Sequence, residues 1–208
     1  MKLAVVSETS AGDRNADILN ALEDRGHQVI NAGMTASGAK PELTYIHTGL
    51  ISAIYLNAGA VDFVVGGCGT GQGYLNAVMQ YPGIFCGHIL TPLDAWLFTQ
   101  INGGNCISLM LNQGYGWASN VNLRMIFDAL FSVESGLGYP PHRRESQQAS
   151  RDTLGEISMK THLSMAEVIH HLPNEVLEPV FTYPGFFENL GFNDLPDSPL
   201  KAALTEWR

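Results

Sequence analysis

The sequence predicts an α/β fold: a Rossmann-like three-layer α/β/α sandwich with a five-stranded parallel sheet and a C-terminal extension. Short apolar runs alternate with segments of helical periodicity, which is typical of βαβ units with parallel strands. The 208 residues suit one such domain with an appendix, and 45% hydrophobic residues can fill its core. We therefore expect an α/β domain at residues 1–135 and an extension at residues 136–208.

Continuous apolar runs predict the strands, and apolar residues three to four positions apart predict the helices. Two helix starts carry caps: Thr91 precedes Pro92, and Ser164 forms a capping box with Glu167. In chain order the predicted elements of the domain are strand 2–7, helix 13–25, strand 27–31, helix 43–57, strand 61–67, helix 73–80, strand 83–87, helix 92–100, strand 105–109 and helix 117–133.

The extension changes in character, and its residues 139–150 (YPPHRRESQQAS) are polar and marked by prolines. We expect it to pack on the domain or on a partner subunit rather than to form a second catalytic domain. Trp117, Tyr139 and residues 181–192 (FTYPGFFENLGF) are either interface anchors or core.

The net charge of −9 argues against binding to nucleic acid or to an anionic membrane. If the ligand is anionic, a few local cations must hold it against the field of the whole protein. The three cysteines, Cys68, Cys86 and Cys106, contain no CxxC spacing, so neither a disulfide framework nor a zinc site is expected. A reducing cytoplasm fits this pattern, and no apolar run is long enough for a signal peptide or a membrane span.

Residues 66–73 (GGCGTGQG) form the most informative segment, because they follow a strand and open a helix. Backbone amides in such a loop can converge on an anion; the alternative is a tight turn without a ligand. Four familiar motifs are absent. These are the GxGxxG of dinucleotide-binding proteins, the GK[ST] of phosphate-binding loops, the aspartate of receiver domains and the arginine of thiol phosphatases, whose position holds Tyr74. Cys68 remains as a base or nucleophile, or as an inert loop thiol; Cys86 and Cys106 lie in apolar strands and are expected in the core.

Residues 61–109 resemble the ribose-5-phosphate isomerase B and galactose-6-phosphate isomerase family. The CGTGxG loop, the PGI before the fourth strand and the QxNxxN before the fifth strand match its layout. Tyr45 and His47 stand where the family has a Tyr-Pro-His element, with Ile46 in place of the proline. The resemblance covers about residues 1–155.

The resemblance implies aldose–ketose isomerisation through a cis-enediolate, without metal or cofactor, in dimers whose active sites lie at the subunit interface. It makes Cys68 the base that moves the proton and Asn102 a hydrogen-bond donor to the developing oxyanion. Thr70 and the amides of the loop glycines would stabilise the enediolate; these glycines are Gly69, Gly71 and Gly73.

Two departures bear on the substrate. Ile101 occupies the place of the histidine that opens the sugar ring in the family, and Glu8–Thr9 replaces an Asp-His pair whose histidine helps to bind phosphate. Glu8 keeps a carboxylate for substrate hydroxyls. A longer branch of similar length isomerises the open-chain sugar 4-deoxy-L-threo-5-hexosulose uronate. A sugar phosphate and such a uronate therefore both remain possible substrates, and a non-catalytic sugar-acid or sugar-phosphate binding module is the alternative from another functional class.

The only dense basic cluster consists of His142, Arg143 and Arg144, in the region where the family places its phosphate-binding arginines. Arginine can bind phosphate or carboxylate with two parallel hydrogen bonds. We therefore expect these three residues, together with Tyr45 and His47, to contact a small anionic sugar.

Overall fold

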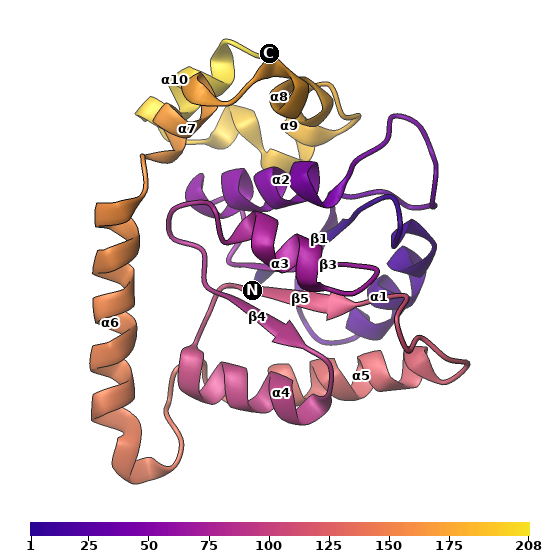
Figure 1. Ribbon diagram of the computed structural model, residues 1–208, viewed down its shortest axis with the longest axis vertical. Helices are drawn as coiled ribbons and strands as arrows, with labels where there is room; N and C mark the ends of the chain where they lie inside the picture. The colour runs from indigo at the N-terminus through magenta and orange to yellow at the C-terminus, as the bar shows by residue number, and fades with distance from the viewer.

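The computed structural model describes residues 1–208 and confirms the predicted fold class (Figure 1). A five-stranded sheet in the order β2-β1-β3-β5-β4 has all its strands parallel. The strands are β1 (Lys2–Ser7), β2 (Gln28–Asn31), β3 (Phe63–Cys68), β4 (Cys86–Ile89) and β5 (Cys106–Met110).

Helices cover both faces of the sheet. One face carries α1 (Asn15–Leu22), α4 (Pro92–Leu97) and α5 (Ser119–Leu130), and the other carries α2 (Tyr45–Asn57) and α3 (Gln72–Val78). From β1 the chain moves to one side, to β2, and then returns to place β3 on the other side. The order of the strands therefore reverses between β1 and β3, where loops diverge and α/β proteins bind their ligands.

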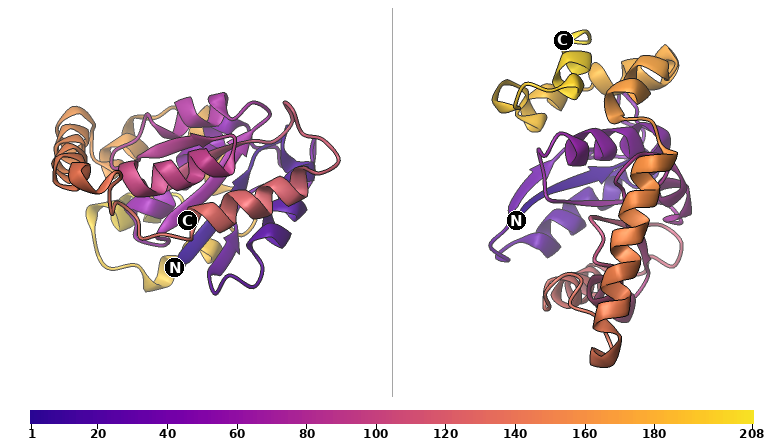
Figure 2. Two further views of the ribbon diagram at one scale, coloured as in Figure 1. Left: turned by 90° about the horizontal axis from the view of Figure 1, so that it is seen from below. Right: turned by 90° about the vertical axis from the view of Figure 1, so that its left-hand side faces the viewer.

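The extension begins with α6 (Arg144–Thr161), a long helix that stands at the side of the sandwich (Figures 1 and 2). The sequence analysis treats the start of this region only as a polar stretch and does not predict the helix. Its amphipathic pattern is weak, since Ser158 is its only buried residue. The predicted capping box is present: the Ser164 hydroxyl accepts from the Glu167 amide at the start of α7 (Met165–His171).

The rest of the extension packs on α2 of the same chain and consists of α7, α8 (Asn174–Phe181), α9 (Phe186–Leu190) and α10 (Pro199–Thr205). Residues 48–55 of α2 are all buried, because the sheet lies on one side of this helix and the extension on the other. Tyr55 donates to the carbonyl of Phe186 at 2.9 Å, and Phe186 packs edge-on against Phe181. The segment 181–192 is thus core.

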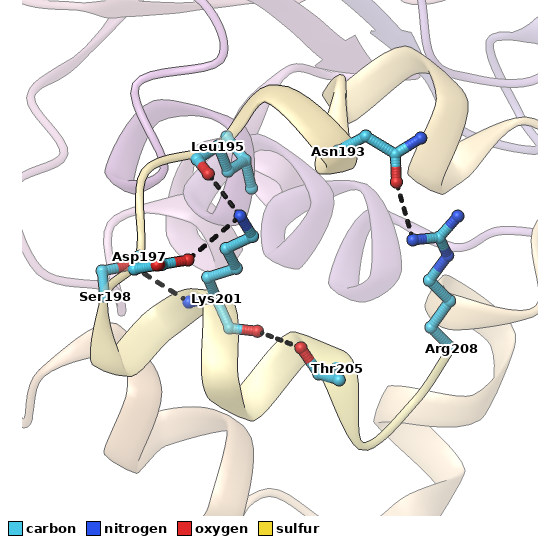
Figure 3. Close-up of polar contacts among 7 residues, drawn as sticks. All are labelled: Asn193, Leu195, Asp197, Ser198, Lys201, Thr205 and Arg208. Carbon is cyan, nitrogen blue, oxygen red and sulfur yellow. Dashed lines mark hydrogen bonds and ion pairs between the residues drawn. The ribbon is translucent and has the colours of Figure 1, made fainter.

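Polar contacts fix the last turns of the chain (Figure 3). The Lys201 ammonium donates to the Leu195 carbonyl at 2.6 Å and pairs with Asp197 at 3.3 Å. Ser198 caps α10 by accepting from the Lys201 amide, and Arg208 donates to Asn193 at 2.8 Å.

Most element boundaries lie within a few residues of prediction, and two of the shifts, both next to β5, have a visible cause. Strand β4 begins at Cys86 rather than residue 83, because the backbone amides before Cys86 donate to side chains instead of to a neighbouring strand. The Gly83 amide donates to Ser158 and the Phe85 amide to Asn105. Helix α4 ends at Leu97, and a π-helical turn over Phe98–Asn102 follows it. No helix of the chain combines the length and apolarity needed to cross a membrane.

Replacing Phe186 with alanine tests whether the extension shares the core of the domain. Phe186 is 2% exposed within the cluster that includes α2, so Phe186→Ala should lower the free energy of unfolding by about 3–5 kcal/mol. Urea unfolding measures this. Trp117→Ala is the control: its side chain is 99% exposed, and its removal should change stability by no more than about 0.5 kcal/mol. Equal midpoints for the two variants would show that the extension does not stabilise the domain.

Candidate active site

The loops after β1 and β3 leave the sheet at its reversal point, where Ser7 pairs with Gly67 in register. Glu8 begins the first loop and is 3% exposed, while Cys68 ends β3 and is 5% exposed. The carboxyl ends of the two strands therefore bring a carboxylate and a thiol to the same edge of the sheet.

Cys68 lies beside Gly73 and the ring of Tyr45. A Cβ atom at Gly73 would be 3.5 Å from the Cys68 sulfur and 3.3 Å from the Tyr45 ring. The predicted residues Cys68, Gly73 and Tyr45 thus form one group, in which the half-exposed tyrosine borders the thiol.

Ser10, which the sequence analysis does not single out, connects three loops at this edge. Its hydroxyl donates to the Glu8 carboxylate and accepts from the Gly69 amide at 3.2 Å. Its carbonyl accepts from the Asn112 side chain, in the loop after β5, at 2.6 Å. No sequence motif reveals this role, because the three partners are far apart in the chain.

The glycine loop depends on its conformation at Gly71, which has a φ of +78° and packs against the ring of His88. His88 donates from Nε2 to the Thr70 carbonyl at 3.0 Å, and Ser108 donates to the Gly71 carbonyl. His88 therefore holds the loop.

Of the three glycine amides expected to stabilise the enediolate, two already have acceptors within the chain. The Gly69 amide donates to Ser10, and the Gly71 amide donates to the Cys68 carbonyl at 3.2 Å. The amides of Thr70 and Gly73 donate to no acceptor within the chain. These two N–H groups, beside the thiol, are the ones available to a developing oxyanion.

His47 caps α2: its Nδ1 accepts from the Thr44 amide at 3.0 Å. Burial lowers the pKa of His47, and a hydrogen bond with the backbone of Glu175 opposes part of the shift. The structure therefore gives His47 a role at the start of α2 and a contact with the extension, whereas Tyr45 borders Cys68.

Asn102 lies at the opposite edge of the sheet from Cys68. In the parallel register Val64 pairs with Cys106 and Cys68 with Met110, so Asn102 precedes the beginning of β5. The strand from Val64 to Cys68 alone spans about 13 Å. One copy of the chain therefore does not bring Asn102 and Cys68 together.

Asn102 and Ile101 line a cavity of about 620 Å³ between the π-helical turn and α6. Arg143 and Arg151 add positive charge to its wall. Arg151, another residue absent from the sequence predictions, donates to the Ile101 carbonyl at 3.0 Å and to the Gly136 carbonyl at 2.6 Å. Arg151 thereby fixes the backbone on which Asn102 sits.

The three residues of the basic cluster do not line one common cavity in the structure. Arg143 lines the Asn102 cavity, whereas Arg144 lines a different cavity of about 380 Å³ beside Glu134 and Glu145. His142 is exposed and lines neither of these cavities. No group of three or more His, Cys, Asp and Glu side chains is placed to hold a metal ion.

Comparisons with known proteins give a consistent assignment. The family model described as Ribose/Galactose Isomerase matches residues 3–135. No curated protein matches the sequence. A ribose-5-phosphate isomerase structure from Vibrio parahaemolyticus is 37% identical, with a TM-score of 0.94 over 100% of this chain and 99% of the other.

A 4-deoxy-L-threo-5-hexosulose-uronate ketol-isomerase, solved with a tartrate, is 35% identical over 100% of this chain and 99% of the other, with a TM-score of 0.92. Ribose-5-phosphate isomerase B from Clostridium thermocellum, at 22% identity, covers 78% of this chain with a TM-score of 0.63 and supports the fold alone. The predicted enzyme class, an isomerase that interconverts aldoses and ketoses, is confirmed. The chain belongs to the Ribose/Galactose Isomerase family of sugar isomerases.

Proposed function

We propose that the protein isomerises an open-chain acidic sugar, a 5-keto uronate such as 4-deoxy-L-threo-5-hexosulose uronate, at a site formed by two copies of the chain. One copy supplies the loop with Cys68, and the other supplies the cavity with Asn102. One observation carries the choice of substrate: the residue next to Asn102 is Ile101, an isoleucine.

Ile101 lines the cavity and cannot transfer a proton, and no histidine is among the lining residues. Cys86, which also lines it, remains protonated because burial and a hydrogen bond with Cys106 raise its pKa. His88, on the Cys68 side, already uses Nε2 to hold the Thr70 carbonyl. An aldose that is mostly a closed ring needs general acid–base help to open, whereas an open-chain uronate needs none.

The charge of the cavity supports an acidic substrate. Two arginines, Arg143 and Arg151, and one carboxylate, Asp152, lie on its wall, in a protein of net charge −9. Arg151 already binds two backbone carbonyls, while Arg143 bonds only to Ser146, at 3.3 Å. A guanidinium with free donors can bind a carboxylate through two parallel hydrogen bonds, so we assign this contact to Arg143.

The reaction then requires one base and an oxyanion site. The Cys68 thiolate removes the proton from C2 of the aldose, and the electron pair of the C–H bond forms the C1–C2 double bond of an enediolate. Asn102 of the second copy and the free amides of Thr70 and Gly73 stabilise the oxygen charge. The Cys68 thiol returns the proton to C1, the proton of the C2 hydroxyl passes to the C1 oxygen, and the ketose results.

Exposed apolar side chains around the Asn102 cavity support a second copy at this end of the molecule. Large exposed apolar patches are typical of protein interfaces. Met79 and Leu154 are exposed and line the cavity, and α6 adds the exposed side chains of Ile157 and Met159.

Subunit mixing tests the two-copy site. Cys68→Ala and Asn102→Ala should each lower kcat by at least about 10²-fold. When the two inactive variants exchange subunits, activity should return, because each mixed dimer then contains one intact site. Mass spectrometry confirms that mixed dimers form. If they form and remain inactive, Cys68 and Asn102 do not act in the same site.

Arg143 and Arg144 are adjacent in the chain, so a matched pair of variants can test which arginine binds the anion. Arg143→Ala should raise KM for the uronate roughly 10–100-fold, the equivalent of about 1.5–3 kcal/mol for a charge-assisted hydrogen bond. Arg144→Ala removes the same charge one residue away and should leave KM unchanged. Steady-state kinetics at fixed ionic strength measure both. An equal rise in the two variants would assign the effect to the general field instead.

The choice of substrate is tested by comparing kcat/KM for the uronate with that for ribose 5-phosphate. The wild-type enzyme should prefer the uronate. Ile101→His should raise kcat/KM for ribose 5-phosphate by about 10² or more, because it adds an acid–base group where the ring would open; Ile101→Leu is the control. Efficient wild-type turnover of ribose 5-phosphate without activity on the uronate would contradict the proposal, and would favour the activity named for the relative from Vibrio parahaemolyticus.

A further inference from the structure

A second cleft lies on the α1 and α5 side of the sheet, and we propose that it binds an acidic sugar separately from the catalytic site. The loop between β5 and α5, which projects at the right of Figure 1, forms one wall. The cleft has a volume of about 480 Å³, within the range of small-molecule sites. Its lining residues are Arg14, Asp17, Tyr115, Gly116, Trp117 and Asn120.

Arg14 supplies an unneutralised positive charge. Its guanidinium stacks on the Tyr115 ring, 4.4 Å from the ring centre, and its buried Nε has no hydrogen-bond partner. Arg14 forms no ion pair, although the protein carries a net charge of −9. The nearby Asp17 carboxylate accepts from the Tyr115 hydroxyl at 2.7 Å instead. A guanidinium stacked on an aromatic ring, with its donors unused, is suited to bind an oxyanion.

The other walls suit a sugar ring rather than a bare anion. Trp117 is 99% exposed and gives the cleft a flat apolar face, against which the C–H groups of a sugar can pack. Asp17 and Asn120 bring oxygen and amide groups to the same cleft, where they can bond to hydroxyls. A carboxylate on the sugar would then lie at Arg14.

The cleft and Cys68 both lie at the carboxyl edge of the sheet, where the Asn112 amide donates to the Gly69 carbonyl, but they face opposite sides of it. The Cys68 side chain belongs to the core on the α2 and α3 face, and the Tyr115 ring packs against the core on the opposite face. None of the residues grouped around the thiol, Cys68, Gly73 and Tyr45, lines this cleft.

Fluorine NMR of protein labelled with 5-fluorotryptophan tests the proposal. The chain has three tryptophans, and Trp117→Phe identifies the resonance of Trp117. Titration with D-galacturonate should shift this resonance saturably, and the neutral D-galactose should not. Arg14→Ala should weaken galacturonate binding at least about tenfold. Arg124→Ala, which removes an exposed arginine of α5, should leave binding unchanged.

Two further measurements separate the alternatives. Inorganic phosphate should shift Trp117 only at far higher concentrations than galacturonate; equal affinity would show an anion site without sugar recognition and overturn the proposal. Arg14→Ala should keep the kcat/KM of the wild type; a rise in KM equal to the loss of galacturonate affinity would place Arg14 in the catalytic site and also overturn it. The absence of a Trp117 shift, or the same shift in Arg14→Ala, would contradict binding itself.

Discussion

All strands of the sheet run in the same direction, and this constraint divides the chemistry of the chain between two edges. Groups that follow strands, such as Glu8 and Cys68, gather at one edge, while Asn102, which precedes a strand, is held at the other. Loop movement cannot join these edges without breaking the sheet. A symmetric dimer can, because each copy offers one edge of each kind and closure generates two equivalent sites.

Within the Cys68 edge, the polar groups are ordered before any substrate arrives. Glu8 is almost fully buried and its carboxylate is satisfied by Ser10, whose hydroxyl also accepts from the glycine loop. The loop is fixed on its other side by His88. Such preorganisation matters for enediolate chemistry, because donors that need no rearrangement stabilise the transition state most effectively.

The fold class, the order of the strands along the chain and the loop with Cys68 could be predicted from the sequence. Each depends on the local spacing of apolar residues or on residues that are adjacent in the chain. The long helix α6 could not be predicted, because it exposes most of its side chains and lacks a clear apolar stripe. Ser10 and Arg151 were missed for another reason: their partners lie up to 102 residues away. Sequence spacing also failed to show that Arg143 and Arg144, although adjacent, face different cavities.

The burial of residues 48–55 of α2 on every side has a consequence for how proteins of this fold can differ in length. The isomerase from Clostridium thermocellum matches 78% of this chain, while the two relatives with TM-scores above 0.9 match all of it. Loss of the extension would leave the outer face of α2, with Tyr55 among its residues, open to water. A shorter protein of this fold therefore needs a different α2 surface, so chain length and the composition of one internal helix must change together during evolution.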